Sequence, residues 1–141
     1  MGASISHANN TITVKKADLF GIEIDASQIP DLVPVISVVA SVAMGKTKIY
    51  NASRLRLKES DRLQSVCDML TTLGADIKQT SDGLIIHGKS SLCGGTVSSC
   101  NDHRIAMSAA VASLVCTSPV TVEGIEAIKK SYPAFLSDFI V

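Results

Sequence analysis

The sequence is poor in aromatic and charged residues. It contains no tryptophan, aromatic residues make up 4% of its 141 residues, and charged residues make up 18%. The core must therefore be built from aliphatic side chains, which is typical of an α/β (α+β) fold and not of a β-sandwich or a coiled coil. Lysine and arginine (13) balance aspartate and glutamate (13). No long-range field would attract nucleic acid or a membrane, so any anion site must be local.

The sequence also lacks the cysteine and histidine spacing of a metal site, and it has no apolar run long enough to span a membrane. No two of the four cysteines form a CxxC pair, and the three histidines are scattered, so we expect no bound metal. Unpaired cysteines are typical of a reducing compartment, and we expect a cytoplasmic protein. The longest apolar run, 32–44, is interrupted by Pro34 and is too short to span a bilayer. Residues 1–10 match no element, and a cloning or fragment junction is one interpretation of them.

Hydrophobic periodicity predicts alternating strands and helices. The predicted strands are 11–14, 21–24, 47–50, 76–80, 84–87, 96–98 and 119–123. The predicted helices are 31–44, 60–73, 103–115 and 133–140. The fourth and fifth strands flank Ser81-Asp-Gly83, which indicates a β-hairpin. The first and third helices are apolar on nearly every face, which indicates buried helices with sheets outside them.

The order of these elements indicates an internal repeat. A βαβαββ unit over about 20–90 is followed by a truncated copy, βαβα, over 91–141. Asp31 and Asp102, 71 residues apart, each open the first helix of a unit. We therefore predict that residues 1–141 form a single partial domain with a pseudo-symmetric fold.

Three predicted helix starts carry a cation. Arg62, Arg104 and Lys130 lie where a helix N-terminus already has a partial positive charge, and Lys130 follows Glu59 by 71 residues. A bound anion would offset these charges. If the repeat brings the helix starts together, they form a cationic site that also contains Glu59 and Asp31. A carboxylate beside cations can accept a proton from a substrate hydroxyl.

A purely structural interpretation remains open at this point. Residues 54–63 also fit an ordinary capped helix start with surface ion pairs, each worth about 0–1 kcal/mol. His103 alone is better interpreted as a capping or supporting histidine than as a catalytic one.

Four motifs resemble the C-terminal third of the EPSP synthase family. They are Ile29-Pro-Asp31, Leu57-Lys-Glu-Ser-Asp-Arg-Leu63, Asn101-Asp-His-Arg-Ile-Ala-Met107 and Lys130-Ser-Tyr-Pro133. The resemblance covers about 11–139. It implies two lobes, each with three βαβαββ copies, of which this chain would supply about two. The sister family, UDP-N-acetylglucosamine enolpyruvyl transferase, shares the fold but not the second and third motifs.

The resemblance also implies an activity. The family transfers the enolpyruvyl group of phosphoenolpyruvate to the 5-hydroxyl of shikimate 3-phosphate, in aromatic amino-acid biosynthesis, with no metal or organic cofactor. The missing N-terminal part of the same enzyme would be the partner that completes the site, so we expect the isolated chain to be inactive. The alternatives are a non-catalytic module that binds phospho-anions, a UDP-N-acetylglucosamine enolpyruvyl transferase-like enzyme, and a structural protein with solvated caps.

Catalytic roles are implied for three residues. Asp31 matches the proton-accepting aspartate, which also touches the shikimate hydroxyls. Glu59 matches an acid/base carboxylate near the methylene carbon of phosphoenolpyruvate. Lys130 matches a residue that holds phosphoenolpyruvate and shuttles protons.

Binding roles are implied for four more. Lys58 matches a residue on the 3-phosphate of the shikimate substrate. Arg62 and Arg104 match residues that hold phosphoenolpyruvate. Arg54 stands where some members carry an asparagine that contacts phosphoshikimate, so its role stays open. Two phosphates and a carboxylate need several fixed positive charges, in agreement with the cation count above.

Overall fold

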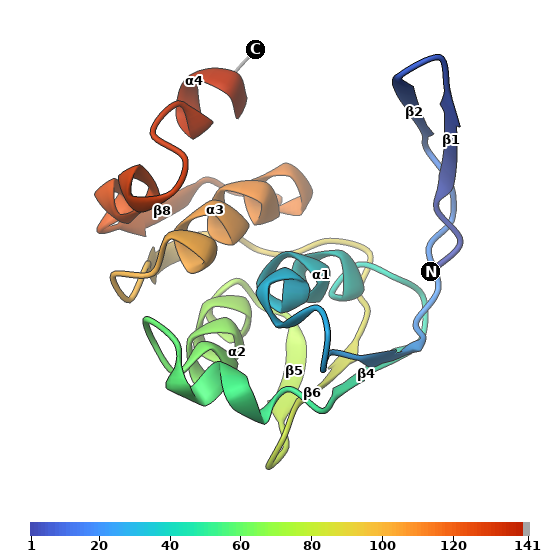
Figure 1. The fold of residues 1–141 in the computed structure, drawn as a ribbon. Helices are drawn as coiled ribbons and strands as arrows, with labels where there is room; N and C mark the ends of the chain where they lie inside the picture. The colour runs from blue at the N-terminus through green and yellow to red at the C-terminus, as the bar shows by residue number, and fades with distance from the viewer. Residues whose placement is uncertain (140–141) are drawn as a thin grey trace.

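A computed structural model describes residues 1–139 (Figure 1). The strands are β1 (Ser4–Ala8), β2 (Thr11–Lys15), β3 (Glu23–Asp25), β4 (Lys46–Tyr50), β5 (Asp76–Gln79), β6 (Leu84–His87), β7 (Gly95–Ser98) and β8 (Val120–Glu123). The α-helices are α1 (Val33–Ala40), α2 (Arg62–Thr72), α3 (His103–Ala112) and α4 (Phe135–Phe139). Short 3-10 helices are η1 (Pro30–Leu32), η2 (Ser53–Leu57), η3 (Ser113–Val115) and η4 (Ile125–Lys130).

The strands form three separate sheets. The largest has the order β3-β4-β6-β5, with β3 parallel to β4 and the other two pairs antiparallel. A second sheet pairs β7 and β8 in parallel, and a third pairs β1 and β2 in antiparallel. The β5–β6 pair confirms the predicted hairpin. The parallel pairs β3–β4 and β7–β8 support the predicted repeat, which stays a prediction.

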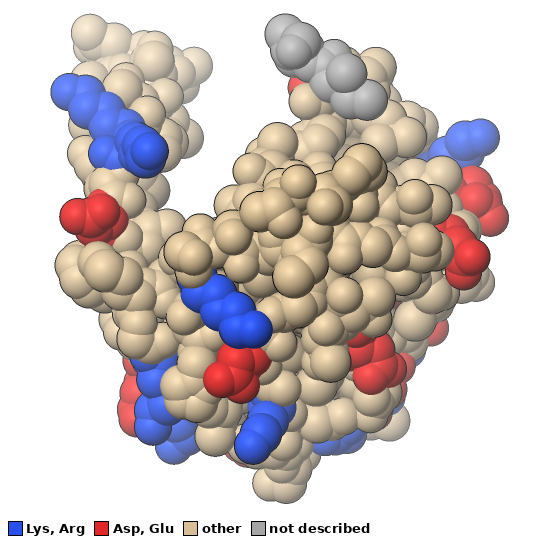
Figure 2. Space-filling model, turned by 180° about the vertical axis from the view of Figure 1, so that it is seen from behind, with Lys and Arg blue, Asp and Glu red and all other residues tan. Residues whose placement is uncertain are grey.

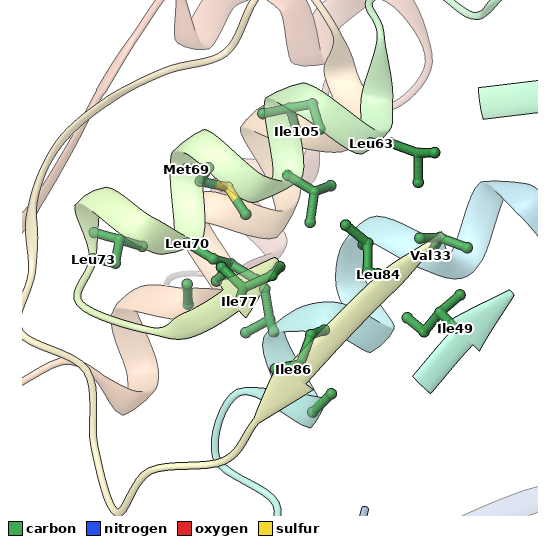
Figure 3. Packing of buried hydrophobic residues seen from close by; sticks show 14 of the residues in the cluster. Val33, Ile49, Leu63, Met69, Leu70, Leu73, Ile77, Leu84, Ile86 and Ile105 are labelled. Atoms are coloured by element: carbon green, nitrogen blue, oxygen red, sulfur yellow. The ribbon is translucent and has the colours of Figure 1, made fainter. Parts of the chain in front are cut away.

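Aliphatic side chains from helices and sheet fill the core (Figure 3). The apolar face of α2 meets the inner face of the β5–β6 hairpin, where Ile77, Leu84 and Ile86 are buried. Ile105 of α3 closes the same cluster. Burying such a side chain contributes about 1.5–3 kcal/mol, so this contact fixes α2 on the sheet. The expected aliphatic core is confirmed.

Helix α1 is shorter than predicted. It ends at Ala40, not near Met44. The Ser41 hydroxyl donates to the carbonyl of Val38 at 2.6 Å, and the Met44 N–H donates to the carbonyl of Leu19 at 2.7 Å. Hydroxyls that bond the preceding turn compete with helix continuation. The chain therefore leaves the helix early to reach the segment before β3.

Helices α2 and α3 start at aspartate caps. The carboxylate of Asp61 accepts from the Gln64 N–H at 3.2 Å, and that of Asp102 accepts from the Arg104 N–H at 2.9 Å. Gly74, with φ of +85°, follows α2, because glycine adopts this left-handed conformation without strain.

No helix starts at Lys130, so that part of the prediction was wrong. Lys130 is the last residue of η4, and the next helix, α4, begins at Phe135. Tyr132 precedes Pro133, and a residue before proline is disfavoured in helical conformation. The last predicted helical position, Ile140, lies outside the described residues.

Strand β1 was not predicted. It pairs with β2 through a two-residue turn at Asn9 and Asn10, whose φ angles are 49° and 60°, as a type I′ hairpin turn requires. The hairpin stands away from the rest of the molecule, and Figure 2, seen from behind, shows it rising beside the body at the upper left. We call it the arm (Ser4–Lys15). Within residues 1–139, no helix has the length and hydropathy needed to cross a membrane.

Candidate active site

Arg62 is a buried arginine that bonds three carboxylates. Its Nε donates to Oδ2 of Asp102 at 2.7 Å, its Nη1 donates to Oδ1 of Asp31 at 2.8 Å, and its Nη2 donates to Oε2 of Glu59 at 2.5 Å. Its side chain is 1% exposed. The three carboxylates together outweigh the effect of burial, which by itself would lower the pKa of Arg62, and raise that pKa. A guanidinium can satisfy three partners because its donors point in fixed, different directions.

These contacts bring the N-terminal ends of α1, α2 and α3 together. Arg62 is the first residue of α2, Asp102 is the N-cap of α3, and Asp31 lies in η1 just before α1. All three ends carry free N–H groups and positive dipole ends. Their convergence makes a region where an anion is favourable.

Asp31 lies between three cations and is partly open to solvent. It accepts from Arg62 and from Arg104 Nη2 at 3.0 Å, and Lys58 Nζ lies 3.6 Å away. Its side chain is 43% exposed. Although burial by itself would raise the pKa of Asp31, the charges of Arg104, Lys58 and Arg62 hold it below its ordinary value. Asp31 is therefore ionised near neutral pH.

Asp102 is the site residue that sequence reasoning missed, since it was interpreted only as a helix cap. Its side chain is fully buried and also accepts from the Ser60 hydroxyl at 3.2 Å. Burial by itself would raise the pKa of Asp102, but the bonds from Arg62, the Arg104 N–H and Ser60 lower it. An aspartate cap of a buried helix followed by basic residues was the signal in the sequence.

His103 lies beside Glu59. Its Nδ1 is 3.9 Å from Oε1 of Glu59, is buried, and has no hydrogen-bond partner among residues 1–139. A small approach of the two side chains would satisfy this nitrogen. The supporting role expected for His103 stays a prediction.

Lys130 contacts the residue before the N-cap of α3. Its Nζ donates to both the backbone carbonyl and Oδ1 of Asn101, each at 2.7 Å. Asn101 directly precedes the cap Asp102. Lys130 therefore lies next to the cluster, but among the described residues it bonds none of the three carboxylates around Arg62.

Arg54 stays outside the cluster. It is exposed on η2, and within the described part of the chain it makes no hydrogen bond or ion pair. The neighbouring Arg56 instead bonds Asp61 at 2.8 Å and the carbonyl of Thr80 at 3.0 Å. Arg56 therefore ties η2 to the α2 cap and to the β5–β6 hairpin.

The cluster is close to electrically neutral, which the cation count from sequence did not indicate. Three cations face three carboxylates: Lys58, Arg62 and Arg104, and Asp31, Glu59 and Asp102. An incoming anion would therefore compete with Asp31 for the donors of Arg62 and Arg104. A cavity of about 190 Å³ opens beside Asp31 and Arg104 and is otherwise mainly apolar, with Leu32, Val35, Met107, Ser108, Val111 and Phe135 in its wall.

The sequence model of the EPSP synthase (3-phosphoshikimate 1-carboxyvinyltransferase) family matches residues 1–139. The chain belongs to this family. The match includes residues 1–10, which argues against a cloning junction there, and a fragment junction stays a prediction. The EPSP synthase assignment also favours this family over the sister UDP-N-acetylglucosamine enolpyruvyl transferases.

Individual members of the EPSP synthase family are also similar to this chain in sequence. A 3-phosphoshikimate 1-carboxyvinyltransferase of Clostridium novyi is 53% identical over 139 residues, which are 99% of this chain and 32% of that protein. The enzyme so named in Clostridium kluyveri is 51% identical and is covered to 33%. The chain thus spans about a third of the length of the relatives it matches.

A solved EPSP synthase structure shows the same fold. The 2.37 Å structure from Acinetobacter baumannii superposes with a TM-score of 0.82 at 34% sequence identity, over 97% of this chain and 34% of that one. The predicted fold class, α/β with the enolpyruvyl transferase arrangement of helices and sheets, is therefore confirmed.

Proposed function

We propose that the chain is part of an enzyme that transfers the enolpyruvyl group of phosphoenolpyruvate to the 5-hydroxyl of shikimate 3-phosphate and releases phosphate. The observation that carries this proposal is the buried Arg62, held where three helix N-termini meet and flanked by the partly exposed carboxylates Asp31 and Glu59. Relatives that share about half of the sequence are named for this transfer.

Both substrates are anions, and the cations of the cluster suit them. We assign Lys58 to the 3-phosphate of phosphoshikimate, and Arg62 and Arg104 to phosphoenolpyruvate, with Lys130 beside them. Arg62 and Arg104 now bond Asp31. Phosphate or carboxylate oxygens can replace Asp31 on these guanidinium groups in paired, charge-assisted bonds.

This exchange would prepare Asp31 as a base. The cations that lower its pKa would turn to the substrate, and the pKa of Asp31 would rise toward its ordinary value. A carboxylate accepts a proton more readily as its pKa rises toward the working pH. In this role Asp31 takes the proton of the 5-hydroxyl as the oxygen attacks C2 of phosphoenolpyruvate.

Glu59 and Lys130 serve the proton steps at the methylene carbon. In the addition, C3 gains a proton and C2 becomes a tetrahedral ketal phosphate. In the elimination, C3 loses a proton, the C2–O bond to phosphate breaks, and the double bond re-forms. We assign the C3 proton to Glu59, with His103 supporting its position at 3.9 Å, and a shuttling role to Lys130.

The isolated chain would lack much of this site. It spans about a third of the length of its relatives, so other parts of the enzyme would complete the substrate contacts. Arg54 would contact phosphoshikimate only in the complete enzyme.

We also place the protein in the cytoplasm, because its four cysteines are free among the described residues and reducing compartments keep thiols unpaired.

A chimera provides the test. This chain replaces the corresponding third of the Clostridium novyi enzyme, and phosphate release is measured with both substrates. We expect turnover, and a loss of about 10²–10⁴-fold in kcat for Glu59→Gln. Lys130→Met should lose activity, whereas Lys129→Met, an exposed neighbour, should retain it. Saturable phosphoshikimate binding with turnover unaffected by Glu59→Gln and Asp31→Asn would instead support a non-catalytic anion-binding role.

A further inference from the structure

The segment between η2 and α2 carries two residues of the candidate site but has little backbone support. This connecting segment, residues 58–60, contains Lys58 and Glu59. Within the described part of the chain, its N–H and carbonyl groups form no hydrogen bond with other backbone groups. Its third residue, Ser60, bonds Asp102 through its hydroxyl at 3.2 Å. A segment without backbone bonds opens at a small cost in free energy unless side chains hold it.

Arg56 joins the two ends of the connecting segment to each other and to the sheet. Its Nη1 donates to Oδ2 of Asp61 at 2.8 Å, so this ion pair spans residues 58–60. Its Nη2 donates to the carbonyl of Thr80 at 3.0 Å and to Oε1 of Gln79 at 3.2 Å. One guanidinium can make all these bonds because its donors point in fixed, different directions. Both ends of the segment are thereby attached to the β5–β6 hairpin.

The corresponding position of the second unit has a backbone hydrogen bond instead. At the offset of 71 residues between the units, Arg56 corresponds to Ala127 and Asp61 to Tyr132, so the second unit has no such ion pair. There the Tyr132 N–H donates to the carbonyl of Ile128 at 3.0 Å, and no bond of this kind forms at the equivalent position of the first unit. The ion pair is therefore present where the backbone bond is absent.

Substrate binding would increase the importance of Arg56. In the structure, Lys58 lies 3.6 Å from Asp31, and Glu59 accepts from Arg62 at 2.5 Å. Under the proposed function, substrate anions compete for the same lysine and guanidinium groups, and these two contacts would weaken. The bonds of Arg56 lie outside this competition, because they join the connecting segment to the hairpin and not to the other helix ends.

We propose that Arg56 is a positioning residue of the transfer reaction: through Asp61 and the β5–β6 hairpin, it holds Lys58 and Glu59 in place while both substrates are bound. This assignment rests on the proposed function. Arg56 acts through the connecting segment and not on the reacting atoms. Misplacing a catalytic group by about 1 Å can cost about 10²-fold in rate, so a support outside the site can limit turnover.

Steady-state kinetics of the chimera separate positioning from stability. Arg56→Ala should lower kcat about 10–100-fold through Glu59 and raise KM for shikimate 3-phosphate about tenfold through Lys58. A variant that is only less stable loses active molecules, so its apparent kcat falls while both KM values stay constant. The matched control is Lys78→Ala, which removes an exposed cation of β5 and should leave kcat and KM unchanged.

A milder variant covers the case in which the alanine variant does not fold. Arg56→Lys keeps the positive charge but cannot bond Asp61 and the hairpin together as the planar guanidinium does. Its kcat and its KM for shikimate 3-phosphate should lie between those of the unmodified chimera and of Arg56→Ala. Circular dichroism checks that each variant is folded.

Limited proteolysis tests the support of the segment without relying on activity. Trypsin cleavage after Lys58, identified by mass spectrometry, should become about tenfold faster in Arg56→Ala, because the segment opens more often. Cleavage after Lys48, inside the central strand β4, requires unfolding of the sheet and should keep its rate. Local release of the segment and global loss of stability are thereby distinguished.

Three outcomes would overturn the assignment. If the unmodified chimera turns over and both Arg56 variants keep its kcat and KM, Arg56 has no positioning role and the proposed function stands. A lower kcat at constant KM, with faster cleavage after both Lys58 and Lys48, would limit Arg56 to stability. A folded, unmodified chimera without turnover would overturn the proposed function, and this assignment with it.

Discussion

Arg62 Nε lies 2.7 Å from Asp102 Oδ2, and the two side chains are 1% and 0% exposed. This buried pair joins the first residue of α2 to the cap of α3, 40 positions apart in the chain. Removing one member of such a pair leaves a charge in the interior without compensation, which costs far more than the pair contributes when intact.

Replacement of Arg62 should therefore be severe. We expect Arg62→Met to lower the free energy of unfolding by about 3–5 kcal/mol, because Asp102 would stay buried without its cation. Urea denaturation followed by circular dichroism measures the change. Arg54→Met is the matched control: Arg54 is exposed, so its loss should stay within about 0.5 kcal/mol. Equal effects of the two substitutions would contradict the structural role of Arg62.

Acid should destabilise the protein through Asp102 and Asp31. Both pKa values are lowered in the folded state, so their stabilisation is complete above the ordinary carboxyl value and is lost as pH falls through the folded-state pKa. The free energy of unfolding should thus decrease below about pH 4. Asp102→Asn should be less stable at pH 7 and should show a shallower acid decrease than the unmodified chain. An unchanged slope would rule out Asp102 as a contributor.

The core contact between α2 and the sheet can be tested at Leu84. Its side chain is fully buried, so Leu84→Ala should cost about 2–5 kcal/mol of unfolding free energy through lost transfer energy and a cavity. Leu57→Ala removes the same atoms from a side chain that is 88% exposed and should cost little. Thermal and urea unfolding of both variants would separate the effect of burial from the effect of the Leu→Ala change itself.

Two glycines distinguish backbone strain from crowding. Gly45 and Gly74 have φ angles of +88° and +85°, but a Cβ at Gly45 would meet nothing within 4 Å, whereas one at Gly74 would lie 2.8 Å from the Sγ of Cys93. Gly45→Ala should cost about 1–2 kcal/mol from left-handed strain alone. Gly74→Ala should cost more, and the double variant Gly74→Ala with Cys93→Ala should recover the difference. Equal losses for both single variants would show that Cys93 moves away freely.

Local signals predicted the elements well and their contacts less well. The α2 boundaries followed from the Asp61 cap and Gly74, because caps and stops depend on residues next to them in sequence. The early end of α1 depends in part on the bond from Met44 to Leu19, and no local pattern encodes a partner on a different segment. Strand β1 was missed because Ser4-Ile-Ser-His-Ala8 shows only a weak alternation of apolar and polar residues.

In the candidate site, too, most of the residues were predictable from sequence, whereas some of the contacts between them were not. Identity and order of motifs indicated Arg62, Arg104, Asp31 and Glu59, and the structure brings these four together. The contact between Asp102 and Arg62 was not predictable, since an N-cap has the same sequence signal whether it faces solvent or an arginine from another helix. Lys130 was placed at a helix start by analogy between units, and Pro133 breaks that analogy.

The arm also has a consequence for how the molecule unfolds. Among residues 1–139, β1 pairs only with β2, within a stretch of twelve residues, so the body loses little when the arm opens. Opening there needs only a small free energy, whereas opening of β6 must disrupt two neighbouring strands and the helix packed on them. The arm and the β5–β6 hairpin belong to different cooperative units, and amide hydrogens of the arm should exchange with solvent far sooner than those of β5–β6.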